Sequence, residues 1–322
     1  MNDQINILCI TPIRHIEGVE DLLSSLGNLI IVDDPTLSEF QQNILSMNAI
    51  FTNPNKSKVF LGKESLQAAK DLEVICTAST GTNHIDINYC MQRGIKILSL
   101  TKELEVISKI SSTAEHALAL LLSCVRNIKS SSLSVDEGSW NYEPFIGRQL
   151  NQLTIGILGY GRLGKMMAKF CKPLFRRVMI YDPYEHVNDI ALDQVSSLDD
   201  IASYSDVISL HVHVSDETIH LISRDFLSKA KPNVLFVNTS RGEIVDETEM
   251  VKFLMSHPHS KIATDVLDNE ITDKKSSKLL LFSKESNQVL ITPHIGGMTS
   301  DAQKIAYSHA AKMLADYITL SR

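Results

Sequence analysis

The sequence predicts an α/β protein with two doubly wound parallel sheets. Short apolar runs alternate with longer amphipathic stretches along the 322 residues, and this alternation is typical of parallel sheets covered by helices on both faces. The runs form two series, separated by a polar segment at residues 130–150, and a glycine-rich stretch lies at the start of the second series. A chain of this length accommodates about two domains.

The first series predicts a set of buried strands, because each run is short, apolar and bounded by polar residues. These runs are residues 5–10, 29–32, 49–52, 72–78 and 95–100. Helical patterns lie between them, for example at residues 64–71 and 85–93. We therefore expect strands and helices to alternate in this part of the chain.

A longer helix is predicted at residues 112–127, where alanine and leucine dominate and Ser111 or Ser112 can cap the first turn. The polar segment that follows, residues 130–150, contains glycines, a proline and the single tryptophan, Trp140. This composition predicts a loop that crosses between two structural units.

The second series predicts six more strands, the number expected of a complete dinucleotide-binding fold. They are residues 154–158, 178–181, 207–210, 234–238, 261–264 and 289–292. The chain then closes with an amphipathic helical pattern at residues 300–320.

Composition and charge argue against several classes of protein. The formal charge is 31 − 38 = −7, and a mildly acidic surface does not favour a nucleic-acid partner. No apolar run approaches the ~20 residues of a membrane span, and the first residues lack the features of a signal peptide. We therefore expect a cytoplasmic protein that binds neither nucleic acid nor membranes.

The cysteines and histidines give no sign of a metal site. The five cysteines are an odd number without a Cys-x-x-Cys pair, which predicts buried, reduced thiols. The histidines lack the fixed spacing of metal ligands, so we expect no metal. His116 lies in the alanine- and leucine-rich helix, and we expect it to be a packed or interface residue.

A glycine motif at the start of the second series predicts a dinucleotide site. Gly159, Gly161 and Gly164 match the pattern G-x-G-x-x-G, directly after an apolar strand, and Arg162 and Leu163 lie at the start of a helical pattern. The first glycine permits the turn, the second lets the backbone approach a pyrophosphate, and the third lets the helix pack on the strand. The helix N-terminus then offers N–H groups to the phosphates.

An acidic residue in the expected place indicates which dinucleotide binds. Asp182 follows Gly164 by 18 residues, at the end of the next predicted strand. A carboxylate there accepts hydrogen bonds from the adenosine ribose and repels a 2′-phosphate. The sequence therefore predicts NAD rather than NADP as the cofactor.

Three polar clusters follow the last predicted strands, at residues 238–242, 265–270 and 292–297. The carboxyl ends of strands in a doubly wound sheet face the ligand crevice. Arg241, Glu270 and His294 are therefore expected to converge near the nicotinamide. Taken singly, each of the three is more often a structural or solvated residue, and only their joint placement favours a catalytic role.

The three residue types fit hydride transfer to a 2-keto acid. The guanidinium of Arg241 can hold both the carboxylate and the adjacent carbonyl group. His294 is suited to supply the proton that the developing alkoxide needs. A carboxylate such as Glu270 can orient His294 and favour its protonated form.

At this point the sequence resembles the D-2-hydroxyacid dehydrogenases, a family that includes D-3-phosphoglycerate, glycerate and D-lactate dehydrogenases. The matching motifs span most of the chain in the family's order. They are residues 81–86, 114–116, 159–164, 238–242, 265–270 and 292–297.

The resemblance implies roles for individual residues. Arg241, Glu270 and His294 would be the catalytic residues. Backbone N–H groups of residues 79–81 (Ser79, Thr80 and Gly81) would help to hold the substrate carboxylate. Thr239 would lie in the cofactor site, and Asp265 would meet the nicotinamide carboxamide.

The resemblance also implies an architecture. A Rossmann cofactor domain, residues 101–296, would be inserted into a flavodoxin-like substrate domain formed by residues 1–100 and the returning helix at 297–322. The protein would be a homodimer joined through residues 112–127 and the loop around Trp140. Because the chain ends soon after the last helix, no appended regulatory domain is expected.

Departures from the family pattern concern mainly the substrate. Phosphoglycerate enzymes often carry arginines at places that read Thr52-Asn53-Pro54 and Thr77-Ala78-Ser79 here, although Lys56, Lys58 or Lys102 could substitute. We therefore expect a small unphosphorylated acid of the glyoxylate or hydroxypyruvate type. Two further departures are the residue after Glu270, Ile271 in place of proline, and His213 in place of the proline after Leu-His-Val.

Other readings stay open from sequence alone. D-3-phosphoglycerate dehydrogenase is one alternative, and formate or phosphite dehydrogenases share the same architecture. A third alternative is an NAD(H)-responsive binding protein without enzymatic activity. Turnover of NADH with a panel of keto acids separates the last class from the enzymes.

Overall fold

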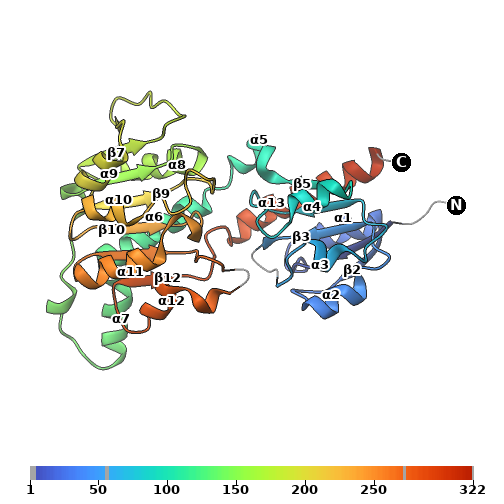
Figure 1. Ribbon diagram of the computed structural model, residues 1–322, viewed down its shortest axis with the longest axis horizontal. Coiled ribbons are helices and arrows are strands. Elements are labelled where there is room, and N and C mark those ends of the chain that lie inside the picture. Colours follow the sequence, from blue (N-terminus) through green and yellow to red (C-terminus); the bar gives the residue numbers. More distant parts are fainter. Residues whose placement is uncertain (1–4, 55–57, 271–272, 321–322) are drawn as a thin grey trace. The chain divides into compact units, whose positions relative to one another are not determined.

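The computed structural model describes residues 5–54, 58–270 and 273–320, and the chain forms two compact units (Figure 1). The first unit comprises Met1–Ile110 and Gly297–Arg322, and the second comprises Ser111–Gly296. Two residues considered above, Lys56 and Ile271, lie outside the described residues.

The first unit contains a five-stranded sheet in which all neighbouring strands are parallel, in the order β2-β1-β3-β4-β5. This is the strand order of flavodoxin-like folds. The strands are β1 (Ile5–Cys9), β2 (Gly27–Ile31), β3 (Ala49–Thr52), β4 (Val74–Thr77) and β5 (Lys96–Ser99). Each predicted strand of the first series is thus confirmed, with ends that differ by at most two residues.

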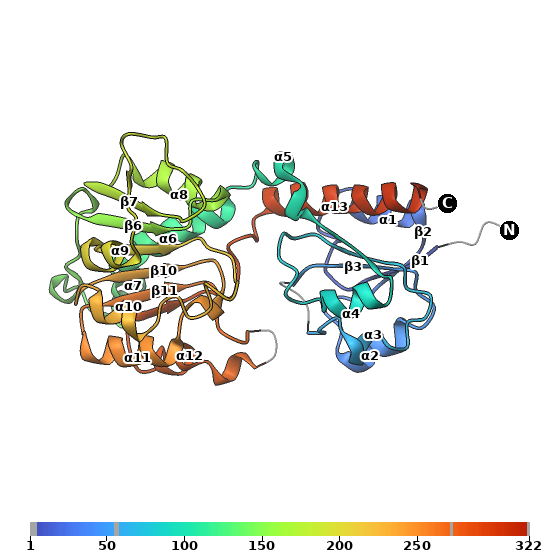
Figure 2. The ribbon, with the colours of Figure 1, turned by 45° about the horizontal axis from the view of Figure 1, so that its top comes forward.

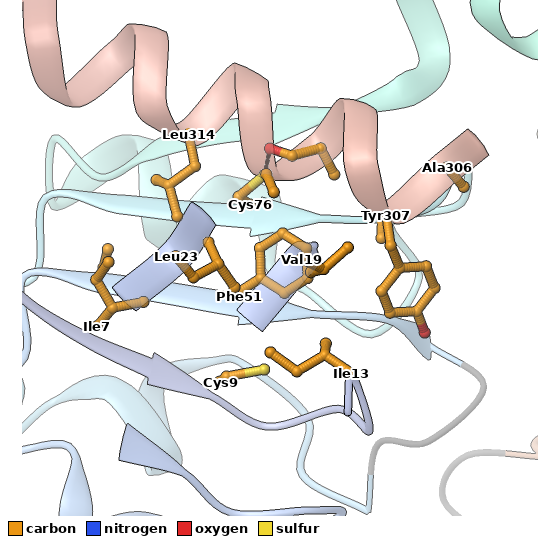
Figure 3. Close-up of a cluster of buried hydrophobic side chains, with 14 of the residues drawn as sticks. Ile7, Cys9, Ile13, Val19, Leu23, Phe51, Cys76, Ala306, Tyr307 and Leu314 are labelled. Atoms are coloured by element: carbon orange, nitrogen blue, oxygen red, sulfur yellow. Dashed lines mark hydrogen bonds between the residues drawn. The ribbon is translucent and has the colours of Figure 1, made fainter. Parts of the chain in front are cut away.

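Helices cover both faces of this sheet (Figure 2). One face packs against α1 (Val19–Leu26) and the C-terminal helix α13 (Ser300–Leu320), and the other packs against α2 (Leu37–Asn43), α3 (Lys63–Leu66) and α4 (Ile87–Gln92). Figure 3 shows Tyr307 and Leu314 of α13 among the side chains that project from the sheet. The Tyr307 hydroxyl lies 3.1 Å from Thr11 Oγ1, so α13 is fixed by packing and by a buried hydrogen bond.

The division between the units lies after Ile110 rather than after residue 100. The short 3-10 turn η2 (Leu100–Lys102) and α5 (Leu104–Ile107) follow β5 directly. Ile107 is buried in the same core as α13, and His309 Nε2 lies 2.7 Å from Glu103 Oε2. These contacts keep the segment with the first unit.

The second unit contains a seven-stranded parallel sheet in the order β12-β11-β10-β9-β6-β7-β8. Read from β8, the order is the Rossmann arrangement 3-2-1-4-5-6 with one further strand. The strands are β6 (Thr154–Leu158), β7 (Arg177–Tyr181), β8 (Asp193–Gln194), β9 (Val207–Leu210), β10 (Leu235–Asn238), β11 (Lys261–Thr264) and β12 (Val289–Ile291). The six predicted strands are confirmed. The sequence did not indicate β8, because its two residues are polar and exposed.

Helices cover both faces of the second sheet as well. On one face lie α6 (Ser112–Val125) and α8 (Arg162–Cys171), which share a core with β6 and β7. Against the other face pack α9 (Leu198–Tyr204), α10 (Arg224–Lys229), α11 (Glu247–Ser256) and α12 (Lys278–Phe282). The predicted fold class, two doubly wound α/β domains, is therefore confirmed.

The loop predicted at residues 130–150 is wrong in its first part. Residues Ile128–Asp136 form the helix α7, after Asn127 in a left-handed conformation, and short 3-10 turns follow at Glu143–Phe145 and Leu150–Gln152. None of the α7 residues is buried. The apolar periodicity that indicates a packed helix is therefore weak, and the serine run resembles a loop.

None of the helices in the described part of the chain is both long and apolar enough to cross a membrane.

Candidate active site

The glycine loop after β6 requires two of its three glycines for steric reasons. Gly159 has φ +92°, and a Cβ there would lie 2.5 Å from the carbonyl oxygen of His211. A Cβ on Gly164 would collide with the carbonyl oxygen of Gly159, so the first turn of α8 packs directly on the loop. By contrast, a Cβ on Gly161 would meet no protein atom within 4 Å. The backbone at Gly161 is thus open to a ligand that approaches closely.

The N-terminus of α8 fits a diphosphate. Gly161 is the N-cap of this ten-residue helix, and no side chain caps its first N–H groups. Arg162 and Leu163 are partly buried in the first turn, and burial lowers the pKa of the Arg162 guanidinium below its usual value. The loop therefore presents backbone donors and the positive end of the helix dipole, which suit phosphate oxygens.

Asp182 lies after β7, and its carboxylate binds the backbone of the glycine loop. Its Oδ2 accepts the Tyr160 N–H at 2.7 Å, and its Oδ1 accepts the N–H groups of Tyr184 and Glu185 at 2.8 and 3.0 Å. A carboxylate has about four acceptor positions, so about one remains for a ribose hydroxyl. Asp182 thus follows β7 directly and lies next to the glycine loop, whose backbone it fixes.

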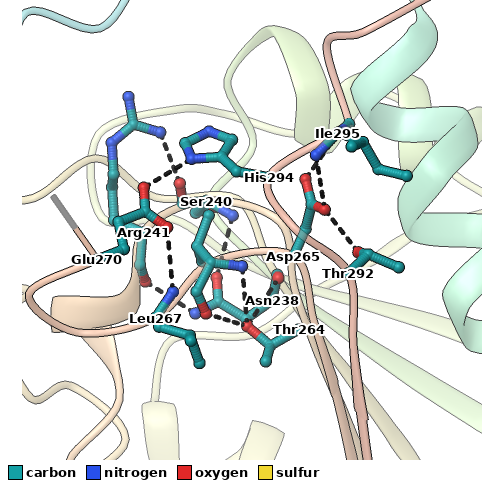
Figure 4. A network of polar contacts seen from close by, with 12 residues as sticks. Asn238, Ser240, Arg241, Thr264, Asp265, Leu267, Glu270, Thr292, His294 and Ile295 are labelled. Carbon is teal, nitrogen blue, oxygen red and sulfur yellow. Dashed lines mark hydrogen bonds and ion pairs between the residues drawn. The ribbon is translucent and has the colours of Figure 1, made fainter. Parts of the chain in front are cut away.

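Three neighbouring strands carry the candidate catalytic residues at their carboxyl ends (Figure 4). Arg241 follows β10, Glu270 follows β11 and His294 follows β12. Glu270 Oε1 lies 2.6 Å from His294 Nδ1, and Glu270 Oε2 accepts the backbone N–H of Leu267 at 3.2 Å. Both side chains are about three-quarters buried or more.

The loop after β10 holds Arg241 through its neighbours. Asn238 Nδ2 donates to the Arg241 carbonyl oxygen at 2.8 Å, and Asn238 Oδ1 accepts the Ser240 N–H at 3.0 Å. Ser240 Oγ donates to the carbonyl oxygen of Leu210 at 2.7 Å. The guanidinium itself donates from Nη1 to the Ser240 carbonyl oxygen at 2.7 Å. Because a guanidinium carries five N–H donors, this contact leaves others for a ligand.

Asp265 fixes the loop that carries His294. The Asp265 carboxylate is 2% exposed and accepts Thr292 Oγ1–H at 2.5 Å and the N–H groups of Ile295 and Gly296 at 2.9 and 2.7 Å. Its carbonyl oxygen accepts the His294 N–H at 2.9 Å. These bonds hold His294 at φ +54°, a left-handed conformation that costs a non-glycine residue roughly 1–2 kcal/mol.

The same network includes His116, which the sequence predicted to be a packed or interface residue. His116 Nε2 on α6 lies 2.9 Å from Thr292 Oγ1 and 3.3 Å from Asp265 Oδ1. Burial alone would raise the pKa of Asp265, but the hydrogen bonds from His116, Thr292 and the backbone hold that pKa below its usual value. His116 and Thr292 are therefore part of the site. For His116, the sequence signal was the motif at residues 114–116, which is one of those that carry the family resemblance.

Thr239 is the remaining candidate in this unit. It follows β10, and its buried Oγ1 has no hydrogen-bond partner among the residues that the structure describes. A buried hydroxyl without a partner is costly, so this oxygen is suited to a hydrogen bond with a bound cofactor.

The candidate residues for substrate carboxylate binding lie in the first unit, after β4. Ser79 Oγ donates to the Gly81 carbonyl oxygen at 2.6 Å, and the Ser79 carbonyl oxygen accepts the Leu100 N–H at 3.0 Å. The backbone N–H groups of Ser79, Thr80 and Gly81 donate to no acceptor within the described ranges. Three successive N–H groups of this kind form a suitable site for a carboxylate.

Across 5–54, 58–270 and 273–320, no group of three or more His, Cys, Asp or Glu side chains is placed to hold a metal ion.

Comparison with known families agrees with this geometry. Residues 118–296, more than half of the chain, match the model of the D-isomer specific 2-hydroxyacid dehydrogenase NAD-binding domain. The chain belongs to the D-2-hydroxyacid dehydrogenase family. The resemblance drawn from the motifs is thereby confirmed, and so is NAD as the cofactor of this domain.

Two relatives within the family carry different names. The chain is 37% identical over 251 residues to a D-3-phosphoglycerate dehydrogenase of Archaeoglobus fulgidus, a match that covers 77% of this chain and 46% of that protein. It is 33% identical over 240 residues to a hydroxypyruvate reductase of Thermotoga maritima, covering 74% of this chain and 75% of that protein. The chain spans about half the length of the D-3-phosphoglycerate dehydrogenases that it matches.

A solved structure of the same family fold extends the comparison to the whole chain. The NAD complex of a formate dehydrogenase from Staphylococcus aureus aligns with a TM-score of 0.84 at 26% identity, covering 99% of this chain and 97% of that one. The three proteins, all similar to this chain, carry names that refer to different activities.

Proposed function

We propose that this protein is an NAD-dependent oxidoreductase that interconverts a small 2-keto acid and the corresponding D-2-hydroxy acid. The observation that carries the proposal is the 2.6 Å contact between Glu270 Oε1 and His294 Nδ1. The pair lies at the same sheet edge as Arg241 and the glycine loop. A carboxylate–imidazole pair at that edge is suited to general acid–base catalysis.

NAD fits the chain's own residues, and when bound it supplies or accepts the hydride. Three features suit such a ligand: the open backbone at Gly161, the start of α8 without a side-chain cap, and the buried Thr239 hydroxyl, which has no partner among the described residues. We also propose that Asp265 contacts the nicotinamide carboxamide. The Asp265 carboxylate is almost fully buried and already accepts hydrogen bonds from Thr292, Ile295, Gly296 and His116, so a carboxamide N–H would share an acceptor position with one of these donors.

His294 transfers the proton in this proposal. Glu270 accepts a hydrogen bond from Nδ1, which fixes the ring orientation, and Nε2 exchanges the proton with the substrate. In keto-acid reduction, the carbonyl carbon gains the hydride and its oxygen takes the proton from His294. In hydroxy-acid oxidation, His294 accepts that proton from the hydroxyl group, and the positive imidazolium is stabilised by the Glu270 carboxylate.

Arg241 binds the acid in the second unit. The guanidinium donors that Ser240 does not occupy pair with the substrate carboxylate and polarise the carbonyl oxygen. In the first unit, the backbone N–H groups of residues 79–81 are proposed to bind a carboxylate without adding a charge.

We favour an unphosphorylated substrate of the glyoxylate or hydroxypyruvate type. A phosphate brings close to two negative charges, which are costly to desolvate without a cationic partner. Thr52 and Thr77, at the ends of β3 and β4, are neutral and buried. Lys58 pairs with Asp34 at 3.1 Å, while Lys102 lies exposed on η2.

D-3-phosphoglycerate dehydrogenase is the second candidate, favoured by the 37% identity to the Archaeoglobus fulgidus protein of that name. The ratio of kcat/KM for hydroxypyruvate to that for 3-phosphohydroxypyruvate decides between the two. The first proposal predicts a ratio above one. A ratio below one would establish the phosphorylated substrate, and a Lys102→Ala variant would then test the exposed lysine.

We further propose that the protein is a homodimer. Apolar side chains are exposed on α7 and on the segment after it, where Trp140 is 90% exposed. Such a surface is typical of an interface.

All five cysteines are buried thiols, which suits the reducing environment of the cytoplasm, where we place the protein.

A further inference from the structure

Glu247, a residue outside the proposed catalytic set, has a buried carboxylate with an unusual set of partners. It is the first residue of α11 and is 8% exposed. Its Oε1 accepts the Asp268 N–H at 3.2 Å and the Ser277 hydroxyl at 2.9 Å, and its Oε2 accepts the Leu279 N–H at 3.3 Å. Glu247 thus binds the chain both before and after Glu270.

Helix capping explains only part of this arrangement. Leu279 is the second residue of α12, so Glu247 accepts one of the free N-terminal N–H groups of that helix, but Asp268 belongs to no helix. The N-cap of α11 is Asp246, whose side chain accepts the Glu249 N–H at 3.0 Å. The short helix α12 has its own cap, because Ser277 Oγ accepts the Leu280 N–H at 3.1 Å. Burying a carboxylate is costly, and no lysine or arginine within the described ranges forms a salt bridge with Glu247. Among the residues that the structure describes, the hydrogen-bond donors to this carboxylate are Asp268, Ser277 and Leu279.

A close backbone contact ties the same segment to Arg241. A Cβ on Gly242 would overlap the peptide that joins Leu267 to Asp268, so the loop that follows β10 lies directly against the loop that follows β11. The Glu270 carboxylate in turn accepts the Leu267 N–H. The Leu267–Asp268 peptide therefore has two neighbours that fix it. Gly242 packs against the peptide, and Glu247 accepts its N–H, which belongs to Asp268.

We propose that Glu247 is a positioning residue, which holds the chain on either side of Glu270. This contact places the Glu270 carboxylate against His294 and keeps its position relative to Arg241. Glu247 itself does not touch the reacting atoms. This inference rests on the proposed roles of Glu270 and His294. It adds a residue whose effect passes through Glu270, and a displacement of about 1 Å at such a group is enough to cost ~10²-fold in rate.

The test compares Glu247→Ala, Glu247→Gln and Ser277→Ala with the matched control Glu249→Gln. Glu249 lies on the same helix but forms its salt bridge with Lys252 at 2.6 Å. We expect kcat for keto-acid reduction to fall about 10- to 100-fold in Glu247→Ala, less in Glu247→Gln and least in Ser277→Ala. KM for NADH should stay constant, the pH–rate profile should move in the same direction as in Glu270→Gln, and Glu249→Gln should keep the wild-type rate.

Hydrogen exchange at Asp268 and Leu279 gives a readout that does not depend on activity. Faster exchange in the Glu247 variants together with a wild-type kcat and pH profile would make Glu247 purely structural and overturn the proposal. Unchanged exchange would show that Glu247 does not hold the segment, which also overturns it. If Glu247→Ala does not fold, Glu247→Gln and Ser277→Ala decide. If the wild-type protein turns over no keto acid, the proposed function fails, whereas the exchange data still test the contact.

Discussion

Glu270 Oε1 lies 2.6 Å from His294 Nδ1, and the loops that carry these two residues are held by different buried acids. Asp265 accepts three hydrogen bonds from the loop around His294, and Glu247 accepts three from the chain on either side of Glu270. The pair is therefore the meeting point of two separately fixed loops. Its geometry depends on residues that do not touch the substrate.

Removal of the proposed acid–base residue should abolish most turnover. His294→Ala should lower kcat by ~10²–10⁴-fold, the usual contribution of a positioned acid or base, while NADH binding measured by fluorescence stays intact. Glu270→Gln should change the pH–rate profile for reduction, because it removes a charge beside His294. An active His294→Ala variant would contradict the assigned role.

Arg241→Ala should weaken substrate binding and also slow turnover. Loss of charge-assisted hydrogen bonds worth about 3 kcal/mol corresponds to ~100-fold in kcat/KM. Arg241→Lys should recover only part of the activity, because an ammonium group lacks the planar fork of the guanidinium. Steady-state kinetics check both variants, with Arg224→Ala on the exposed start of α10 as the control. Equal losses in Arg224→Ala would point to a nonspecific charge effect.

The cofactor preference should depend on the charge of Asp182. Since this carboxylate also holds the N–H groups of Tyr160 and Tyr184, Asp182→Asn is the sharper test: the amide oxygen keeps an acceptor while the repulsion of a 2′-phosphate disappears. The ratio of kcat/KM for NADH to that for NADPH should be well above one in the wild type and should fall in the variant. A wild type that prefers NADPH would refute the assignment.

Light scattering at micromolar concentration should give the mass of a dimer. Trp140→Asp should weaken the dimer, because a charge would replace a large exposed apolar side chain at the expected interface. Leu45→Asp, at an exposed leucine of the first unit, should leave the mass unchanged. A monomeric wild type would exclude the proposed interface.

Most of the fold could be predicted because buried parallel strands are short continuous apolar runs. Once these strands are predicted, the polar residues after β10, β11 and β12 can be placed at one sheet edge, because the carboxyl ends of parallel strands lie at the same edge. β8 and α7 could not be predicted, since β8 has only two exposed polar residues and α7 buries none of its side chains.

The supporting residues were harder to find than the reacting ones. His116 could not be distinguished from a packed histidine, because its partners Thr292 and Asp265 are far away in the sequence. Glu247 and Glu249 are two positions apart on one helix and look alike in the sequence. Only the tertiary structure shows that Glu247 is buried against Ser277 and Leu279.

The most direct test of the account is a spectrophotometric assay of NADH oxidation with glyoxylate, hydroxypyruvate, pyruvate and 3-phosphohydroxypyruvate, for the wild type and His294→Ala. We expect the wild type to consume NADH with at least one of these acids, to form a D-2-hydroxy acid where the product is chiral, and to lose this activity in His294→Ala. A wild-type protein that binds NADH but reduces none of these acids would contradict the proposed activity.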